Sequence, residues 1–329
     1  ADTVPVTVHD LPLPDMATAL ERAADEADRA FDLTAGPPVR AVLWPLADGR
    51  WLVLVTVHHI AVDEVAVGLL WQELSARYRQ IGEGRYRPGV ARTDRVRLAD
   101  VTSWERGRAA DGSAALEHWA GVLAGLDAHI LPTDFDRPRI IDTAGAEERF
   151  IVPAEVMASI RHLSAAQNAS EFMGLLAGFA AAMSMHAGAV DIAVGTPVVG
   201  RDRPELAQVI GSFINVVVVR TMLAGAPGFG EVLRRVRDAA VDAFAHRDVP
   251  FMRVTERIAP HRSLARNPLF QTMFTVAEPA TAALDVPALD SEPVSLPVRR
   301  SKVDLSVVMT VEADGSATGA IHYQTALFT

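Results

Sequence analysis

The stretch between residues 50 and 81 constrains the fold more than any other part of the chain. The run "RWLVLVTV" is rich in branched residues, as buried strands are, and it leads directly into "HHIAVDE" at residues 58–64. From Val65 to about Ile81 the apolar residues return at the spacing of a helix, which the glycines and proline of "GEGRYRPG" end. The sequence therefore predicts a strand that passes through a turn rich in histidine and carboxylate into a helix.

Segments typical of strands and of helices alternate along the rest of the chain, which predicts an α/β fold. Helices are expected over residues 15–31 with Asp15 as N-cap, around Trp104 and Trp119, and over 154–167, 171–186 and 229–246. Strands are expected over 39–46 and 50–57, as a hairpin around "ADG", and over 191–200, 214–222, 269–276, 304–314 and 317–325. A chain of 329 residues, half of them hydrophobic, favours two lobes. We expect an N-terminal lobe over 1–135, a linker over 136–148 and a C-terminal lobe over 149–329.

Composition excludes several classes of function. Cysteine is absent, which removes disulfides, thiolate zinc sites and a cysteine nucleophile. Lys302 is the only lysine, so a phosphate loop of the Gly-Lys-Ser/Thr type cannot exist. Neither the dinucleotide motif G-x-G-x-x-G nor the hydrolase motif G-x-S-x-G occurs. A net charge of -10 argues against nucleic acid as the main partner.

Two further observations bear on localisation. The longest apolar run, Phe172 to Met185, is short for a bilayer span, and a buried helix explains it better. The opening "ADTVPVTVHD" has neither the basic nor the apolar region of a secretion signal. We therefore expect no contact with a membrane and a cytoplasmic location.

The histidines at the predicted strand end are candidates for proton transfer. If His58 and His59 are both extended, they point to opposite faces, and no third histidine lies nearby at ligand spacing, so we expect no metal site. An imidazole is the side chain best matched to moving a proton at neutral pH, and Asp63 or Glu64 can orient it or hold the loop. The pattern favours transfer between two bound substrates, without a covalent enzyme intermediate.

The spacing His58-His59-x-x-x-Asp63 resembles the HHxxxDG motif of condensation domains from nonribosomal peptide synthetases. Four other stretches resemble further motifs of that family, in the family's order: "LADVTSW" (98–104), "IGSFINVVVVR" (210–220), "HRDVPF" (246–251) and "RSLARNPLFQ" (262–271). "VGTPVVGRDRPEL" and "SKVDL" are also similar to family segments. The resemblance covers essentially the whole chain.

The resemblance implies an α/β fold of two chloramphenicol-acetyltransferase-like lobes arranged in a V. It also implies that the family's opening strand and helix would precede Ala1, so that the N-terminal lobe is incomplete. The implied partners are a donor and an acceptor peptidyl carrier domain, and the neighbouring domains of a synthetase. Each carrier presents its substrate on a phosphopantetheine arm, and the domain itself needs no cofactor.

The same resemblance assigns roles to single residues. His59 would be catalytic, while His58 and Asp63 would be structural members of the catalytic motif. Asp63 would pair with an arginine, for which Arg266 is the candidate. The residues expected along the substrate channel are Glu64, Gly211, Ser212 and Asn215, and Trp104 and Arg266 are expected to be structural residues near the site. The arginine-rich stretch 253–266 is either a solvated helix end with its loop, or part of the channel wall or of a docking surface.

The chain departs from the motif at Glu64, where the family has glycine. Glycine at a site usually serves a backbone with positive φ or a close approach of substrate. A carboxylate beside His59 would favour the imidazolium and attract a cationic acceptor. Alternatively, Glu64 could simply face solvent or N-cap the following helix, where negative charge is favourable. Three readings stay open: amide formation, altered chemistry (ester formation, epimerisation or a free-standing acyltransferase), and a silent domain that recruits a tailoring enzyme or carrier.

Overall fold

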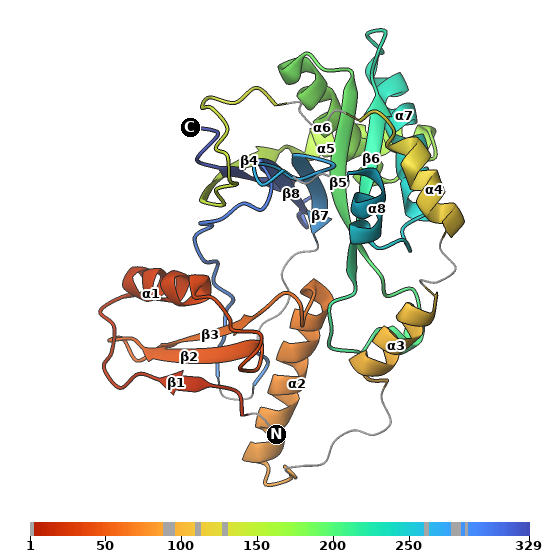
Figure 1. Ribbon diagram of the computed structural model, residues 1–329. Helices are drawn as coiled ribbons and strands as arrows, with labels where there is room; N and C mark the ends of the chain where they lie inside the picture. The colour runs from red at the N-terminus through yellow and green to blue at the C-terminus, as the bar shows by residue number, and fades with distance from the viewer. Residues whose placement is uncertain are drawn as a thin grey trace. The chain divides into compact units, whose positions relative to one another are not determined.

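The chain folds into two compact units, drawn in Figure 1. The structure is a computed structural model that describes residues 3–87, 96–108, 113–126, 131–259, 263–277, 284–286 and 289–329. Unit 1 consists of Ala1–Ser103, Arg201–Phe213 and Ala280–Pro297, and unit 2 of Trp104–Gly200, Ile214–Pro279 and Val298–Thr329. Two later segments thus join the N-terminal residues in unit 1, and the first crossing lies at residues 103–104 instead of the expected 136–148.

Unit 1 is a three-stranded sheet with two helices. Its strand order is β1 (Val6–Val8), β2 (Val39–Pro45) and β3 (Trp51–Val57), with β1 parallel to β2 and β2 antiparallel to β3. Helix α1 (Met16–Asp28) precedes β2, and α2 (Glu64–Gly82) follows β3. The expected hairpin is present, as is the expected passage from a strand through a turn into a helix.

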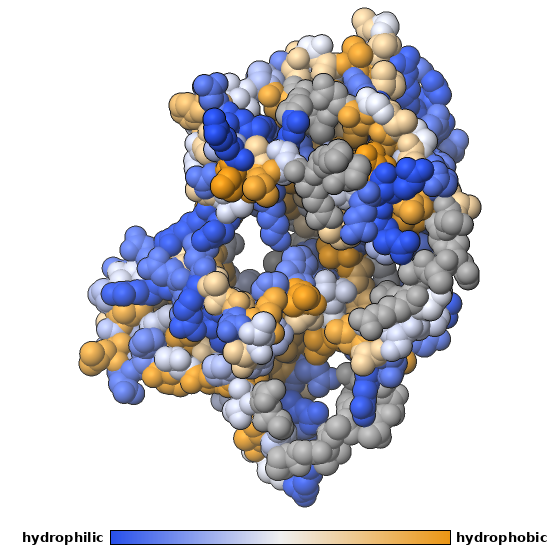
Figure 2. Space-filling model, viewed as in Figure 1, coloured by the Kyte–Doolittle hydropathy of each residue, from blue (hydrophilic) through white to orange (hydrophobic). Residues whose placement is uncertain are grey.

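One face of the unit 1 sheet is covered by α1. The small apolar core between α1 and this face of the sheet is formed by Ala19, Ala23, Val42, Trp44, Leu46 and Leu52. The opposite face leaves apolar side chains at the surface, among them Val6, Val8, Trp51 and Val53, and hydrophobic surface is visible over these strands in Figure 2. A second small cluster joins the start of α3 (Leu98–Arg108) to segment 201–213 through Val101, Leu206, Val209 and Phe213.

Unit 2 is built on a six-stranded mixed sheet of order β4-β9-β8-β7-β5-β6. The strand bounds are Gly145–Val152 (β4), Asp191–Val199 (β5), Ile214–Met222 (β6), Thr272–Ala277 (β7), Leu305–Val311 (β8) and Ala317–Gln324 (β9). β7 lies parallel to β5 and β8, and the remaining pairs are antiparallel. β4 occupies an edge and begins within the stretch that we expected to be a linker.

The helices of unit 2 bury one large apolar core against this sheet. They are α4 (Ser113–Val122), α5 (Ala154–Ala166), α6 (Glu171–Ala187), α7 (Phe229–Ala245) and α8 (Phe251–Ile258). Helices α6 and α7 pack on β5, β6 and β7, and one continuous core cluster includes Leu176, Ile192, Leu233 and Phe274. None of the helices in the described parts of the chain has the length and apolar character needed to cross a bilayer.

Candidate active site

The two histidines lie in the turn that follows β3, beyond the last residue of the strand. The backbone of His58 has no regular secondary structure, and His59 begins a turn that runs to Ala61. Helix α2 then begins at Glu64. Strand alternation therefore does not decide which way either ring points, and the premise of two extended histidines is wrong. The turn itself sets their directions.

His59 is held by one short hydrogen bond and is otherwise exposed. Its Nδ1 lies 2.7 Å from the main-chain oxygen of Val62. A carbonyl oxygen can only accept, so Nδ1 carries the proton, and in the neutral ring Nε2 keeps its lone pair. The turn thus orients the ring and leaves Nε2 as the nitrogen able to accept a proton.

In His58 the ring nitrogen Nδ1 is a hydrogen-bond acceptor, the opposite of its role in His59. Its Nδ1 accepts from the main-chain N–H of Ile60 at 3.1 Å, which leaves Nε2 as the protonated nitrogen of the neutral ring. The ring meets Phe31 edge to face at a centroid distance of 5.9 Å, and the guanidinium of buried Arg40 covers Phe31 at 4.1 Å. These contacts pack His58 against Phe31, and the structural role expected for it stays a prediction.

Asp63 is the most enclosed polar residue of the turn, with a side chain 1% exposed. It caps α2 by accepting from the N–H of Ala66 at 2.8 Å, and it accepts from the N–H of Phe213 at 3.0 Å. Both carboxylate oxygens also contact Arg201, at 2.9 and 3.1 Å from Nη2. Burial alone would raise the pKa of Asp63, but these hydrogen bonds outweigh it and hold the pKa below its usual value.

Arg201 is the arginine that pairs with Asp63, and the expectation of Arg266 in that place is wrong. Its Nη1 donates to the main-chain oxygens of Leu206 and Val209 at 2.7 and 2.8 Å, so one buried guanidinium organises the whole segment 201–213. Arg266 is a half-buried residue of unit 2. The family-like stretch "VGTPVVGRDRPEL" contains Arg201, so the sequence offered it as a possible partner of Asp63. The spacing of the stretch does not single out this arginine, however.

Gly211 is closely packed in unit 1. A Cβ at this position would lie 2.7 Å from Leu98 Cδ1 and 3.0 Å from the Phe213 ring, both closer than ordinary contact. The carbonyl of Gly211 accepts from the N–H of Asp63 at 3.3 Å and from Arg201 at 3.1 Å. The structure thus brings Gly211 and half-buried Ser212 to the Asp63 turn, while their lining of a substrate channel stays a prediction.

Asn215 belongs to unit 2, where its side-chain amide holds the chain before α8. Nδ2 donates to the main-chain oxygens of Arg247 and Val249, each at 2.7 Å, and Oδ1 accepts from the N–H of Phe251 at 3.0 Å. The amide therefore joins two family-like stretches, "IGSFINVVVVR" and "HRDVPF". A place for Asn215 along the channel stays a prediction.

Glu64 begins α2 with its side chain exposed. Among the described residues other than glycine, positive φ occurs only at Asn168 and Ala226, so the backbone at Glu64 does not need glycine. Its negative charge in the first turn is favourable for the helix, and Asp63, not Glu64, is the N-cap. The observations support the solvent-facing interpretation of Glu64.

The other expected residues lie in unit 2. Trp104 is 36% exposed on α3. In the arginine-rich stretch, α8 ends at Ile258, and Arg257 forms an exposed ion pair with Glu117 at 3.0 Å. Residues 260–262 of this stretch are outside the described residues. Its reading as a channel wall or docking surface stays a prediction.

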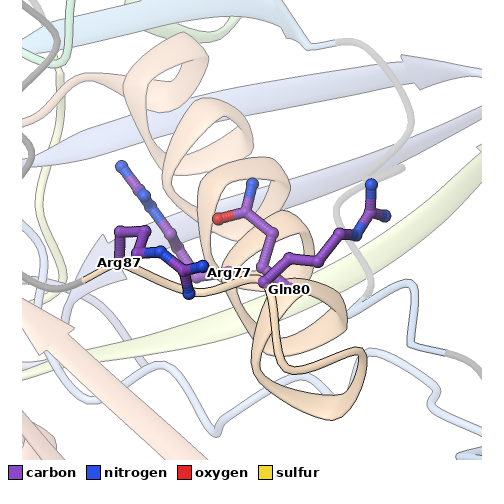
Figure 3. Close-up of a pocket in the computed structure, with 4 residues that line it drawn as sticks. Arg77, Gln80 and Arg87 are labelled. Carbon is purple, nitrogen blue, oxygen red and sulfur yellow. The ribbon is translucent and has the colours of Figure 1, made fainter.

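A pocket of about 340 Å³ lies at the far end of α2. It is lined by Arg77, Gln80, Arg85 and Arg87, as Figure 3 shows. Arg85 is paired with Glu83, and the Arg77 guanidinium lies over the Tyr86 ring at 5.9 Å. A helix of 19 residues is roughly 28 Å long, so this basic pocket is separate from the histidine turn at the start of the same helix.

Comparisons with known proteins agree with the motifs. Residues 2–329 match the family described as Condensation domain. The chain is 35% identical over 344 residues to the phosphinothricin tripeptide synthetase of Streptomyces viridochromogenes, a match that covers 99% of this chain and 30% of that protein. This chain therefore spans less than a third of that synthetase.

Solved structures share the fold. The X-domain from teicoplanin biosynthesis matches with a TM-score of 0.90 and 28% identity, over 100% of this chain and 76% of that one. The X-domain in its complex with OxyB matches with a TM-score of 0.87 and 28% identity, over 99% and 73% of the two chains. The predicted α/β fold and the resemblance based on five motifs are both confirmed.

Proposed function

Because the chain belongs to the condensation-domain family of nonribosomal peptide synthetases, we propose that it joins a carrier-bound acyl or peptidyl thioester to a carrier-bound amine. Amide formation is the general function of this family, and condensation domains work in multidomain synthetases together with carrier domains. In the proposed reaction the amine nitrogen attacks the thioester carbonyl. The C–N bond forms, the C–S bond breaks, and the carrier thiol leaves.

The observation that carries this proposal is the orientation of His59. Its Nδ1–H is committed to the Val62 carbonyl at 2.7 Å, and its exposed ring leaves the Nε2 lone pair for a substrate proton. Nε2 accepts the proton that the attacking nitrogen loses and returns a proton to the leaving sulfur. Asp63 does not touch the substrate in this scheme: it is a positioning residue that fixes the end of the turn through Arg201 and the α2 cap.

Two effects share the rate enhancement. A free α-amino group titrates near pH 7.7–8.0, so an appreciable fraction is already nucleophilic, and orienting two tethered reactants can remove roughly 7–11 kcal/mol of barrier. General base catalysis typically adds about 10²–10⁴ in rate. For an amine acceptor we therefore assign His59 the orientation of the nucleophile and the relay of its proton. A hydroxyl acceptor would depend on the base more strongly.

The test supplies the protein with an acyl-loaded donor carrier and an aminoacyl-loaded acceptor carrier and measures the mass of each carrier over time. We expect acyl transfer to the acceptor, and a loss of about 10²–10⁴ in rate for His59→Ala. His322→Ala is a matched control, because His322 is a half-buried histidine of unit 2. Full activity of His59→Ala would contradict the proposed role. A panel of amine and hydroxyl acceptors separates amide formation from the altered chemistries.

A second candidate function is a domain that recruits another protein without catalysing condensation. Two observations favour it: the motif glycine is replaced by Glu64, and the fold matches an X-domain that has been solved in complex with OxyB. The same carrier assay distinguishes the two functions. Retained carrier binding with no transfer to any acceptor, in both the unaltered protein and Glu64→Gly, would favour recruitment.

A further inference from the structure

A second cluster of titratable side chains lies in unit 2, where α4 meets the end of α7. It consists of His118 on α4, Asp242 in the last turn of α7, and His246 at the C-cap of α7. His118 Nε2 lies 2.9 Å from a carboxylate oxygen of Asp242, and the two imidazole rings stack with centroids 3.6 Å apart. One ligand atom from each residue lies within 4.8 Å of the others.

We propose that His118, Asp242 and His246 bind a divalent transition-metal ion of the zinc class. Two imidazoles and one carboxylate are ligands that zinc and its neighbours prefer, whereas calcium and magnesium prefer sites made of oxygen. Within the described parts of the chain, this is the one group of three such side chains that comes this close. The site takes no part in the proposed condensation reaction.

The distances between the ligand atoms of these three residues fit a bound metal ion after small side-chain movements. Ligand atoms about 2.0–2.2 Å from a tetrahedral ion lie roughly 3.4 Å from one another. The contact between His118 and Asp242 is slightly shorter than this, and no pair of ligand atoms exceeds 4.8 Å. The stacked rings must tilt so that their lone pairs converge, and both side chains are exposed enough to do so, at 28% and 30%.

The surrounding hydrogen bonds orient His246 and the end of α7. Asp242 and His246 are four residues apart and share one face at the end of α7. His246 Nδ1 lies 2.9 Å from the main-chain oxygen of Asp242, an arrangement in which the other ring nitrogen is left for a metal. Trp119 Nε1–H donates to the main-chain oxygen of His246 at 3.1 Å, so α4 also contacts the cap itself.

A metal at this position would join α4 to the end of α7. The next residues of the chain, 247–251, are those that Asn215 holds through its amide. The ion would therefore stabilise the same corner of unit 2 as Asn215 does. Sequence spacing does not reveal the site, because His118 and Asp242 are 124 residues apart, and our expectation of no metal rested on His58 and His59 alone.

The test uses tag-free protein stripped with a chelator and titrated with zinc chloride, followed by calorimetry and thermal unfolding. Cobalt chloride serves as a spectroscopic probe and magnesium chloride as the negative control. We expect one zinc per chain, a melting temperature that rises with zinc concentration, and visible absorption bands of four-coordinate cobalt. His118→Ala and His246→Ala should each weaken zinc binding by roughly tenfold or more, since loss of even an outer-shell partner has effects of this size.

His322→Ala is the matched control, because His322 pairs with Glu147 at the same 2.9 Å but has one imidazole only. It should bind zinc as the unaltered protein does. Asp242→Asn, which keeps the shape of the carboxylate, covers the case in which an alanine variant fails to fold. Absence of stoichiometric zinc binding, or equal binding by Asp242→Asn and the unaltered protein, would overturn the proposal.

Discussion

The two units of this chain are stabilised in different ways. Unit 2 buries one continuous apolar cluster between its six-stranded sheet and its helices. Unit 1 has two small apolar clusters and relies on two buried arginines: Arg40 joins β2 to the end of α1, and Arg201 joins segment 201–213 to the start of α2. The histidine turn thus belongs to the unit with the smaller apolar clusters, and it adjoins one of these two arginines.

This difference teaches how the candidate site keeps its geometry. A large apolar core tolerates many hydrophobic substitutions, whereas a buried ion pair has strict requirements for geometry and for both partners. Asp63, which pairs with Arg201, directly follows Val62, and the carbonyl of Val62 orients His59. We expect changes at this pair to reach the site, and changes of similar kind in unit 2 to leave it unaffected.

The largest effect is expected for Asp63→Ala. Removing one partner of a buried pair leaves an uncompensated charge and typically costs about 3–5 kcal/mol in the free energy of unfolding. Hydrogen exchange read by mass spectrometry should show faster exchange in α2 and in segment 201–213, with unit 2 unchanged, and acyl transfer should be lost.

Arg220→Ala is the matched control for this change. Arg220 pairs with Asp191 at 2.7 Å in unit 2, and the two side chains are 16% and 26% exposed, so the loss should be smaller and confined to unit 2. Exchange in α2 that is as slow in Asp63→Ala as in the unaltered protein would contradict the contrast between the units.

Asn215→Ala should have the next largest effect, and in the other unit. It removes three hydrogen bonds to the main chain of 247–251, at a cost of about 1–3 kcal/mol for the polar groups left unpaired. Limited proteolysis should cut near these residues first. Asn215→Asp keeps the acceptor but places an oxygen against the two main-chain carbonyls, so it should destabilise the protein at least as much as Asn215→Ala. Greater stability of the aspartate variant would contradict the assigned contacts.

Acid should weaken the contribution of Asp63. Its pKa is lowered in the folded state, from a value of about 3.9 in an unfolded chain, so its stabilising contribution is full above about pH 4 and is lost as the pH falls through the folded pKa. The difference in denaturant midpoint between the unaltered protein and Asp63→Asn should be constant from pH 7 to about pH 5 and should shrink below pH 4. A difference that is unchanged at pH 3 would show that the carboxylate charge is not what stabilises unit 1.

Glu64→Gly should have the smallest effect on stability. Glycine in a helix costs about 1 kcal/mol relative to alanine, and loss of a negative charge in the first turn adds about 0.3–1 kcal/mol. We expect a small decrease in the free energy of unfolding and continued acyl transfer, because the exposed glutamate leaves His59 accessible. A large gain of transfer in this variant would instead mean that Glu64 closes the site.

Local patterns predicted most of the fold, and the exceptions have physical reasons. The hairpin, α2 and the strands of the unit 2 core were predicted because their apolar residues repeat at the period of the element. Strand β4 was missed because it is an edge strand whose "GAEERFIV" carries three charges, and β1 because it is three residues long and exposed. Short or edge strands lack the apolar repeat on which such a prediction depends.

The candidate site was predicted only in part. The motif located His58, His59 and Asp63 in one turn, since their spacing is local. The partner of Asp63 lies 138 residues away, and the ring orientation of His59 depends on one carbonyl in the folded turn, so neither follows from spacing. Tertiary contacts between distant segments decide what a local pattern leaves open.

The separation of Asp63 and Arg201 along the sequence affects the order in which contacts form during synthesis. Unit 1 takes its segment 201–213 from between β5 and β6, two strands of unit 2. A ribosome that makes the chain from its N-terminus releases Asp63 long before Arg201, so the histidine turn lacks its arginine while most of unit 1 is already outside the tunnel. Completion of the turn therefore waits until Arg201, 138 residues after Asp63, has been translated. Contacts this distant form slowly because of the entropy of closing the loop.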